Sequence, residues 1–167
     1  MTLIDKIFIP ELKVKADKIV ALYETKRASI LEVLRLVMEH YGYVTIEAEE
    51  AVANYLGIAP IDVHEVITFY TLYYTKPKAK VRFNVCRTLS CSLMGGREVL
   101  SHLEEKLGLK AGEKNASGSC AIQTVECLGA CELAPMLQLN DDEFVGNLTK
   151  EKIDELVAKH NVQRTAP

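Results

Sequence analysis

Up to about residue 77, apolar side chains recur every three or four positions, which is the spacing that places them on one side of an α-helix. The clearest case is the segment 26–42, which closes on Gly42, a residue suited to the left-handed turn after a helix. The apolar side of this segment consists of Ile30, Leu34, Val37, Met38 and Tyr41. The segment is therefore expected to be a helix with one buried side.

Further helices are expected in the same part of the chain. Thr45 is suited to begin one that ends at Gly57, with glutamates in its first turns. Pro60 is suited to the first position of another, over 60–74, and a weaker pattern covers 10–23. Residues 1–77 are therefore predicted to form a small helical bundle.

Beyond residue 77 the pattern changes to short strands that alternate with helices. Strands are expected over 80–85 and 121–126, and two more over 136–146 around a turn at Asn140 and Asp141. Helices are expected over 95–108 and 149–160, the second with Ile153, Leu156, Val157 and His160 on one side. This order implies a parallel pair of strands plus an antiparallel hairpin, with helices on the faces of the sheet.

That order of elements is typical of a thioredoxin-like domain. The expected fold class is therefore α+β, with an N-terminal helical bundle over 1–77 followed by a thioredoxin-like α/β domain with a mixed sheet over 78–167. A chain of 167 residues has room for two small domains of this kind.

Composition and charge argue against binding to nucleic acid and against insertion into a membrane. The formal net charge is −3, so no overall basic field attracts nucleic acid or anionic lipid, and no apolar run reaches the ~20 residues that cross a bilayer. Asp5 and Lys6 interrupt the N-terminus before any long apolar stretch, unlike a signal peptide. The expected location is cytoplasmic, with no direct membrane insertion, and there thiols stay free or bind metal.

The cysteines carry the strongest chemical signal. Two short-spaced pairs, a C-x4-C pair at Cys86 and Cys91 and a C-x3-C pair at Cys127 and Cys131, each follow a predicted strand. Because parallel strands end at the same edge of a sheet, the two loops are expected to converge on one metal site of four thiolates. Cys120 lies at the start of a strand without a close partner and is expected to be a small buried residue.

Spacing alone leaves the metal open. Structural zinc sites use C-x2–4-C pairs on tight turns, whereas a 2Fe–2S cluster is wider and suits more open loops. Small and apolar residues surround the thiols, which favours the cluster, and a zinc-stabilised interaction module is the alternative. The histidines, His40, His64, His102 and His160, show no ligand spacing.

The segments "VCRTLSCSLMGG" (85–96) and "VECLGACELAP" (125–135) resemble the thioredoxin-like 2Fe–2S ferredoxin family. That family includes the 24-kDa-type subunit of NADH dehydrogenase (complex I) and its counterparts in NAD-linked hydrogenases and formate dehydrogenases. The resemblance covers nearly the whole chain and includes "GYVTIEA" and "FYTLYY" in the helical part. It implies one 2Fe–2S cluster with Cys86, Cys91, Cys127 and Cys131 as ligands, and Cys120 outside the motif.

The resemblance also implies a function. The chain would be an electron-transfer subunit that exchanges single electrons with the flavin of an NADH-oxidising or NAD-reducing partner subunit, without catalysis of its own. The sequence has no G-x-G-x-x-G fingerprint and no phosphate-binding loop, so FMN and NADH are expected on the partner subunit only. Arg87 and the start of the helix near Gly95 are expected to supply positive charge and N–H groups to the cluster.

Two other functions fit parts of the sequence less well. The segment 51–70 has the outline of a helix-turn-helix, as in a redox-sensing DNA-binding protein, yet no Lys or Arg occurs between Arg35 and Lys76. A free-standing ferredoxin shuttle would not need the helical domain. The aromatic run Phe69, Tyr70, Tyr73 and Tyr74 is expected to serve as core, as linker packing or as partner interface, and the sequence does not divide these roles. The density of aromatic residues favours at least some protein–protein contact.

Overall fold

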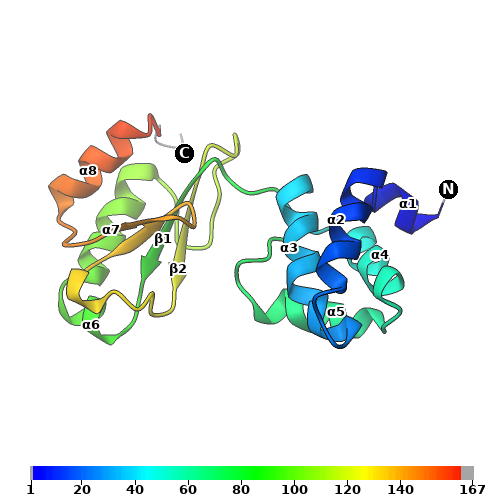
Figure 1. Ribbon diagram of the computed structural model, residues 1–167. Helices are drawn as coiled ribbons and strands as arrows, with labels where there is room; N and C mark the ends of the chain where they lie inside the picture. Colours follow the sequence, from blue (N-terminus) through cyan, green and yellow to red (C-terminus); the bar gives the residue numbers. More distant parts are fainter. Residues whose placement is uncertain (1, 163–167) are drawn as a thin grey trace. The chain divides into compact units, whose positions relative to one another are not determined.

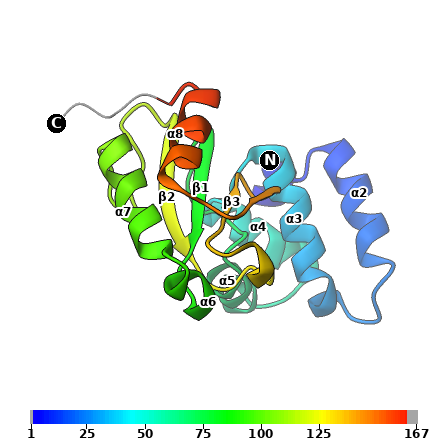
Figure 2. The same ribbon diagram turned by 90° about the vertical axis from the view of Figure 1, so that its left-hand side faces the viewer.

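The computed structural model of the chain describes residues 2–162. The contacts between residues divide the chain between Lys78 and Ala79 into two compact units. We call the first the helical unit and the second, which contains every strand, the sheet unit (Figures 1 and 2). No helix within residues 2–162 has the length and apolarity needed to cross a membrane.

The helical unit contains five α-helices and one 3-10 turn among its described residues. They are α1 (Leu3–Ile7), α2 (Pro10–Val20), η1 (Lys26–Ser29), α3 (Ile30–Tyr41), α4 (Ile46–Leu56) and α5 (Pro60–Phe69). The sequence pattern missed α1 and placed the ends of α2 and α5 too late. The backbone of Tyr70 is extended, with φ −92° and ψ 108°, so the aromatic run after Phe69 leaves the helix.

The caps of the helical unit follow the expected chemistry. The Thr45 hydroxyl accepts a hydrogen bond from the Ala48 N–H at 3.1 Å and starts α4. Gly42 and Gly57 take left-handed conformations at the ends of α3 and α4. These stops allow the helices to turn back and share one core, whose fully buried members include Leu34.

The sheet unit forms around a four-stranded mixed sheet. Its elements are β1 (Val81–Cys86), α6 (Leu89–Leu93), α7 (Gly96–Leu107), β2 (Cys120–Val125), η2 (Cys131–Leu133), β3 (Leu137–Leu139), β4 (Glu143–Val145) and α8 (Lys150–Lys159). The strand order is β2-β1-β3-β4, with β1 and β2 parallel and the other two pairs antiparallel. The predicted fold class, a parallel pair plus an antiparallel hairpin, is confirmed.

The alternation of side chains along β1 places core residues on one face of the sheet and Cys86 on the other. Phe83 and Val85 belong to the apolar core that also contains buried residues of α7 and α8. Arg82, Asn84 and Cys86 alternate with them and therefore point to the opposite face of the sheet. Cys86 belongs instead to a separate buried cluster with residues of the segment 130–136.

We predict that the two units unfold in separate transitions. Leu34→Ala opens a cavity in the helical unit and should cost it about 3 kcal/mol. All seven tyrosines precede Lys78 and the chain has no tryptophan, so tyrosine fluorescence reports on the helical unit alone. The tyrosine-monitored melting temperature should fall, while amide hydrogen exchange in β1 and β2 stays as in the wild type.

The matched control is Phe83→Ala, which removes a fully buried side chain from the sheet unit. It should speed exchange in the strands and leave the tyrosine transition in place. If either substitution shifts both signals by the same amount, the two units form one cooperative structure and the prediction is wrong.

Candidate iron–sulfur site

The five cysteines are all free thiols in very different settings. Cys86 is the last residue of β1 and Cys91 lies within α6, and both are buried. Cys127 lies in the loop after β2 and Cys131 begins η2, and both are exposed. Cys120 starts β2 with none of its surface exposed.

Strand pairing brings the two cysteine loops to one edge of the sheet. In the parallel register of β1 and β2, Cys86 lies opposite Val125, so Cys127 follows only two residues beyond the paired position. The Cys86 N–H also donates to the Met136 carbonyl at 3.2 Å, which ties the end of β1 to the segment before β3. The loop after β2 and the segment before β3 therefore both lie next to the end of β1.

The thiols form two pairs that meet at one hydroxyl. Cys86 hydrogen-bonds with Cys91, and the Sγ atoms of Cys127 and Cys131 lie 3.7 Å apart. The Thr88 Oγ1 lies 3.3 Å from the Cys86 Sγ and also hydrogen-bonds with Cys127. Among the described residues no three His, Cys, Asp or Glu side chains are placed to hold a single metal ion. The arrangement is two thiol pairs side by side, and four thiols are a donor set that a 2Fe–2S cluster accepts.

Thr88 is the residue that the sequence analysis passed over, whereas Gly129 is one of the small residues expected around the thiols. Thr88 lies two positions after Cys86, a spacing at which hydroxyls often bond back to their neighbours. Gly129 has φ +75° and donates its N–H to the Cys127 Sγ at 3.4 Å. Such N–H and hydroxyl donors stabilise thiolate sulfur, so the local chain fits anionic ligands.

Electrostatics differ between the two members of the buried pair. Burial would raise the pKa of Cys86, but hydrogen bonds from the Thr88 side chain and backbone, from Cys91 and from the Leu128 N–H outweigh it and lower that pKa. Burial, together with the neighbouring Cys86 sulfur, raises the pKa of Cys91. One member of the pair is thus prepared as a thiolate before the other.

The pKa values of Cys127 and Cys120 are shifted in opposite directions. The pKa of Cys127 is lowered by the Gly129 N–H, by Cys131 and by Thr88. The pKa of Cys120 is raised by burial, and only the Ser119 side chain opposes this. The expectation that Cys120 is a small buried residue is confirmed by its place in the apolar core.

The apolar surroundings of the thiols are buried on one side and exposed on the other. Ala130, Ala134 and Met136 form a buried cluster with Cys86 and Cys91. Leu89, Leu93 and Met94, on and just after α6, are 73%, 77% and 62% exposed. The site therefore has a dry interior and an apolar rim.

Arg87 does not act as the free cation that the sequence analysis expected. Its guanidinium forms an ion pair with Glu126, and both side chains are largely exposed. The positive charge of Arg87 is thus compensated by a carboxylate at the end of the next strand. The helix expected from Gly95 is also preceded by a short one, α6, which holds Cys91, and α7 begins at Gly96.

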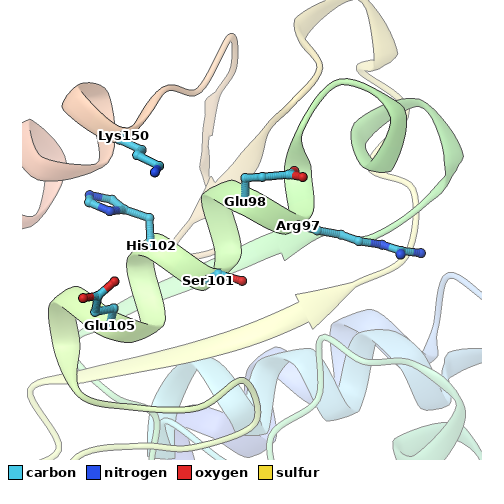
Figure 3. Close-up of a pocket in the computed structure, with 6 residues that line it drawn as sticks. All are labelled: Arg97, Glu98, Ser101, His102, Glu105 and Lys150. Atoms are coloured by element: carbon cyan, nitrogen blue, oxygen red, sulfur yellow. The ribbon is translucent and has the colours of Figure 1, made fainter.

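The histidines lie elsewhere. His64 Nδ1 contacts Glu49 at 3.1 Å, and His102 Nε2 contacts Asp154 at 3.0 Å. His102 lines a hollow of about 280 Å³ together with Lys150, the first residue of α8, and Figure 3 shows both side chains. These two histidines thus contact carboxylates of other elements.

The family comparison decides between the metals that the spacing left open. A family model for the thioredoxin-like [2Fe-2S] ferredoxin matches residues 16–161. The chain belongs to the thioredoxin-like [2Fe-2S] ferredoxin family. The cofactor of this ferredoxin is accordingly one 2Fe–2S cluster, and the two thiol pairs with their N–H and hydroxyl donors fit it.

Its relatives are subunits of one class of oxidoreductase. The ferredoxin is 39% identical to an NADH-quinone oxidoreductase subunit of Rhizobium meliloti, over 82% of this chain and 81% of that one. It is 38% identical to an NADH-quinone oxidoreductase subunit of Thermus thermophilus, over 81% and 75%. The corresponding protein of Aquifex aeolicus, also an NADH-quinone oxidoreductase subunit, is 38% identical over 82% and 86%.

A solved structure shares the fold over most of the ferredoxin. It is the crystal structure of an NAD+-reducing [NiFe]-hydrogenase in the H2-reduced state, with a TM-score of 0.70 at 18% identity. The match covers 87% of this chain and 24% of the hydrogenase chain. The ferredoxin thus spans about a quarter of that longer protein.

We predict that the cluster-free ferredoxin reacts with iodoacetamide at Cys127 well before Cys120. The pKa of Cys127 is lowered, so at a pH below the pKa of an ordinary thiol a larger fraction of Cys127 is thiolate. Its side chain is also exposed to the reagent. Cys120 combines a raised pKa with complete burial. Mass spectrometry of timed samples should find Cys120 unmodified until denaturant is added, and modification of Cys120 in the folded chain at the rate of Cys127 would contradict this.

Proposed function

We propose that the ferredoxin binds its 2Fe–2S cluster through Cys86, Cys91, Cys127 and Cys131, and exchanges single electrons with the flavin of a partner subunit. The partner oxidises NADH or reduces NAD+ within a multi-subunit oxidoreductase. The observation that carries the proposal is the meeting of the two thiol pairs at the Thr88 hydroxyl. Relatives that are NADH-quinone oxidoreductase subunits support the setting.

The residues of the site suit a centre that changes charge without moving a proton. A bound 2Fe–2S cluster supplies one-electron chemistry. Gly129 and Thr88 donate hydrogen bonds to sulfur and would stabilise its negative charge. The buried cluster of Ala130, Ala134 and Met136 would exclude water from one side, while the exposed Cys127 and Cys131 would lie nearer to the redox partner.

FMN and NADH belong to the partner in this proposal. The sequence of the ferredoxin contains no dinucleotide fingerprint, and the site described above consists of thiols and their hydrogen-bond donors. Free thiols in all five cysteines suit the reducing cytoplasm, where we place the complex, on the cytoplasmic side where that complex is membrane-bound.

The helical unit is proposed to dock onto the partner subunit. It holds none of the cysteines, yet it presents Phe69 at 78% exposure and Leu72 at 59%. Tyr73, by contrast, is half-buried, and its hydroxyl donates to the Leu31 carbonyl at 2.8 Å. The aromatic run therefore divides into an exposed part suited to an interface and a part that holds the bundle together.

A DNA-binding role is not favoured. The helices α4 and α5, which gave the helix-turn-helix outline, contain glutamates and aspartate and no Lys or Arg. A protein that binds the phosphates of DNA needs positively charged side chains on its DNA-binding surface. The Arg27 guanidinium contacts α5, and its charge is paired there with Asp62 and Glu65.

The cluster is tested by composition and spectroscopy. The anaerobically purified chain should be brown, with about two iron and two sulfide per chain. Dithionite reduction should give an EPR signal from about one unpaired electron per cluster. A colourless chain with one tightly held zinc and no iron would replace the proposal with the zinc-stabilised module.

The ligand set is tested with two matched serine variants. Cys127→Ser removes a thiol of the exposed pair and should lose or strongly alter the visible and EPR spectra. Cys120→Ser should keep both spectra, at a stability cost of about 1–3 kcal/mol for a hydroxyl in an apolar core. Equal loss of the cluster in both variants would make Cys120 a ligand.

The docking role is tested at the two ends of the aromatic run. Phe69→Ala should weaken assembly with the flavin subunit by about 1–3 kcal/mol, because exposed aromatic anchors dominate many interfaces. It should leave the melting temperature of the isolated chain unchanged. Pull-down affinity and thermal melting are measured side by side.

Tyr73→Ala is the control for this prediction. It removes the hydrogen bond to Leu31 and packing within the bundle, so it should lower the melting temperature of the isolated chain. If Phe69→Ala assembles with wild-type affinity and full activity, the exposed aromatic is not an anchor, and the free-standing shuttle becomes the better explanation.

A further inference from the structure

Arg97 directly follows the cysteine segment 85–96 in the sequence. It is the second residue of α7 and lines a pocket of about 320 Å³ together with Cys86. The residue before it, Gly96, packs against the loop that holds Cys91, because a Cβ at Gly96 would lie 2.7 Å from the Cys91 carbonyl oxygen. The start of α7 is therefore packed closely against the segment that carries Cys91.

The charge of Arg97 is uncompensated at this pocket. Within residues 2–162 Arg97 forms no ion pair or hydrogen bond from its side chain, whereas the other arginine of the pocket, Arg87, is paired with Glu126. Figure 3 shows the Arg97 guanidinium extending away from His102 and Lys150. Glu98, the next residue of α7, lines a second hollow together with Arg97 but forms no ion pair with it. The remaining lining residues carry no charge: Val85, Ser92, Leu100 and Thr124.

We propose that Arg97 raises the reduction potential of the 2Fe–2S cluster. This inference rests on the proposed role of Cys86 as a ligand. Uptake of one electron adds one negative charge to the cluster and its thiolates, with no proton to offset it. A cation in the pocket that Cys86 also lines would stabilise the reduced form more than the oxidised form, because the Coulomb attraction grows with the charge of the cluster.

The exposure of Arg97 limits the size of this effect. Its side chain is exposed to solvent, so water and salt screen its charge. The shift should therefore be largest at low ionic strength and shrink as salt is added. A role in packing alone would not produce this dependence on salt.

The test is an EPR-monitored redox titration of the full chain with its cluster, at low and at high ionic strength. Arg97→Gln should lower the midpoint potential at low salt, and Arg97→Lys should restore most of the wild-type value. Lys159→Gln is the matched control, since it removes one exposed positive charge at the end of α8 and should leave the potential unchanged. Visible spectra and melting temperatures should be the same in all four chains.

The outcomes separate this inference from the proposal on which it rests. A wild-type potential in Arg97→Gln at low salt, with the spectrum intact, would overturn the role of Arg97 alone. An equal shift in Lys159→Gln would overturn it as well, because overall charge rather than the pocket would then set the potential. A wild-type chain without a 2Fe–2S cluster would defeat the proposed function first.

Discussion

The parallel pairing of β1 with β2 is the constraint on which the rest of the site depends. It aligns Cys86 with Val125 and so delivers two loops, far apart in the sequence, to one end of two neighbouring strands. Side-chain alternation in β1 then places Phe83 in the apolar core and Cys86 on the opposite face. One set of backbone hydrogen bonds thus stabilises the sheet unit and assembles the thiols.

Much of this could be predicted because the local signals agree with the final structure. The helix ends could be predicted because the residues that cap them, Thr45, Gly42 and Gly57, are recognisable in the sequence. The cysteine pairs could be predicted because a small error in the ends of the strands does not change their spacing. The prediction failed where long-range contacts decide. The extended backbone at Tyr70 ends α5 early so that Tyr73 can pack beside Leu31, and no local pattern indicates that contact.

The charges near the site also depend on long-range contacts that the sequence does not indicate. Arg87 directly follows Cys86 in the sequence, yet its partner Glu126 is 39 residues away and becomes a neighbour only through the strand register. Arg97 lies just beyond the segment 85–96 and lines the pocket that Cys86 also lines, because Gly96 allows α7 to start against Cys91. Sequence position next to a cysteine is therefore a poor guide to the charge that an arginine presents there.

The uneven burial of the thiols has a consequence for how the protein matures. Before iron and sulfide arrive, Cys127 and Cys131 stand open to solvent with their sulfur atoms 3.7 Å apart, and Cys127 is biased toward the thiolate. The same access that admits a metal donor admits an oxidant, and a disulfide between these two would remove two of the four proposed ligands. On the proposed ligand set, assembly of the cluster would therefore compete with oxidation of the exposed pair, which lies around Gly129 and not in the sheet.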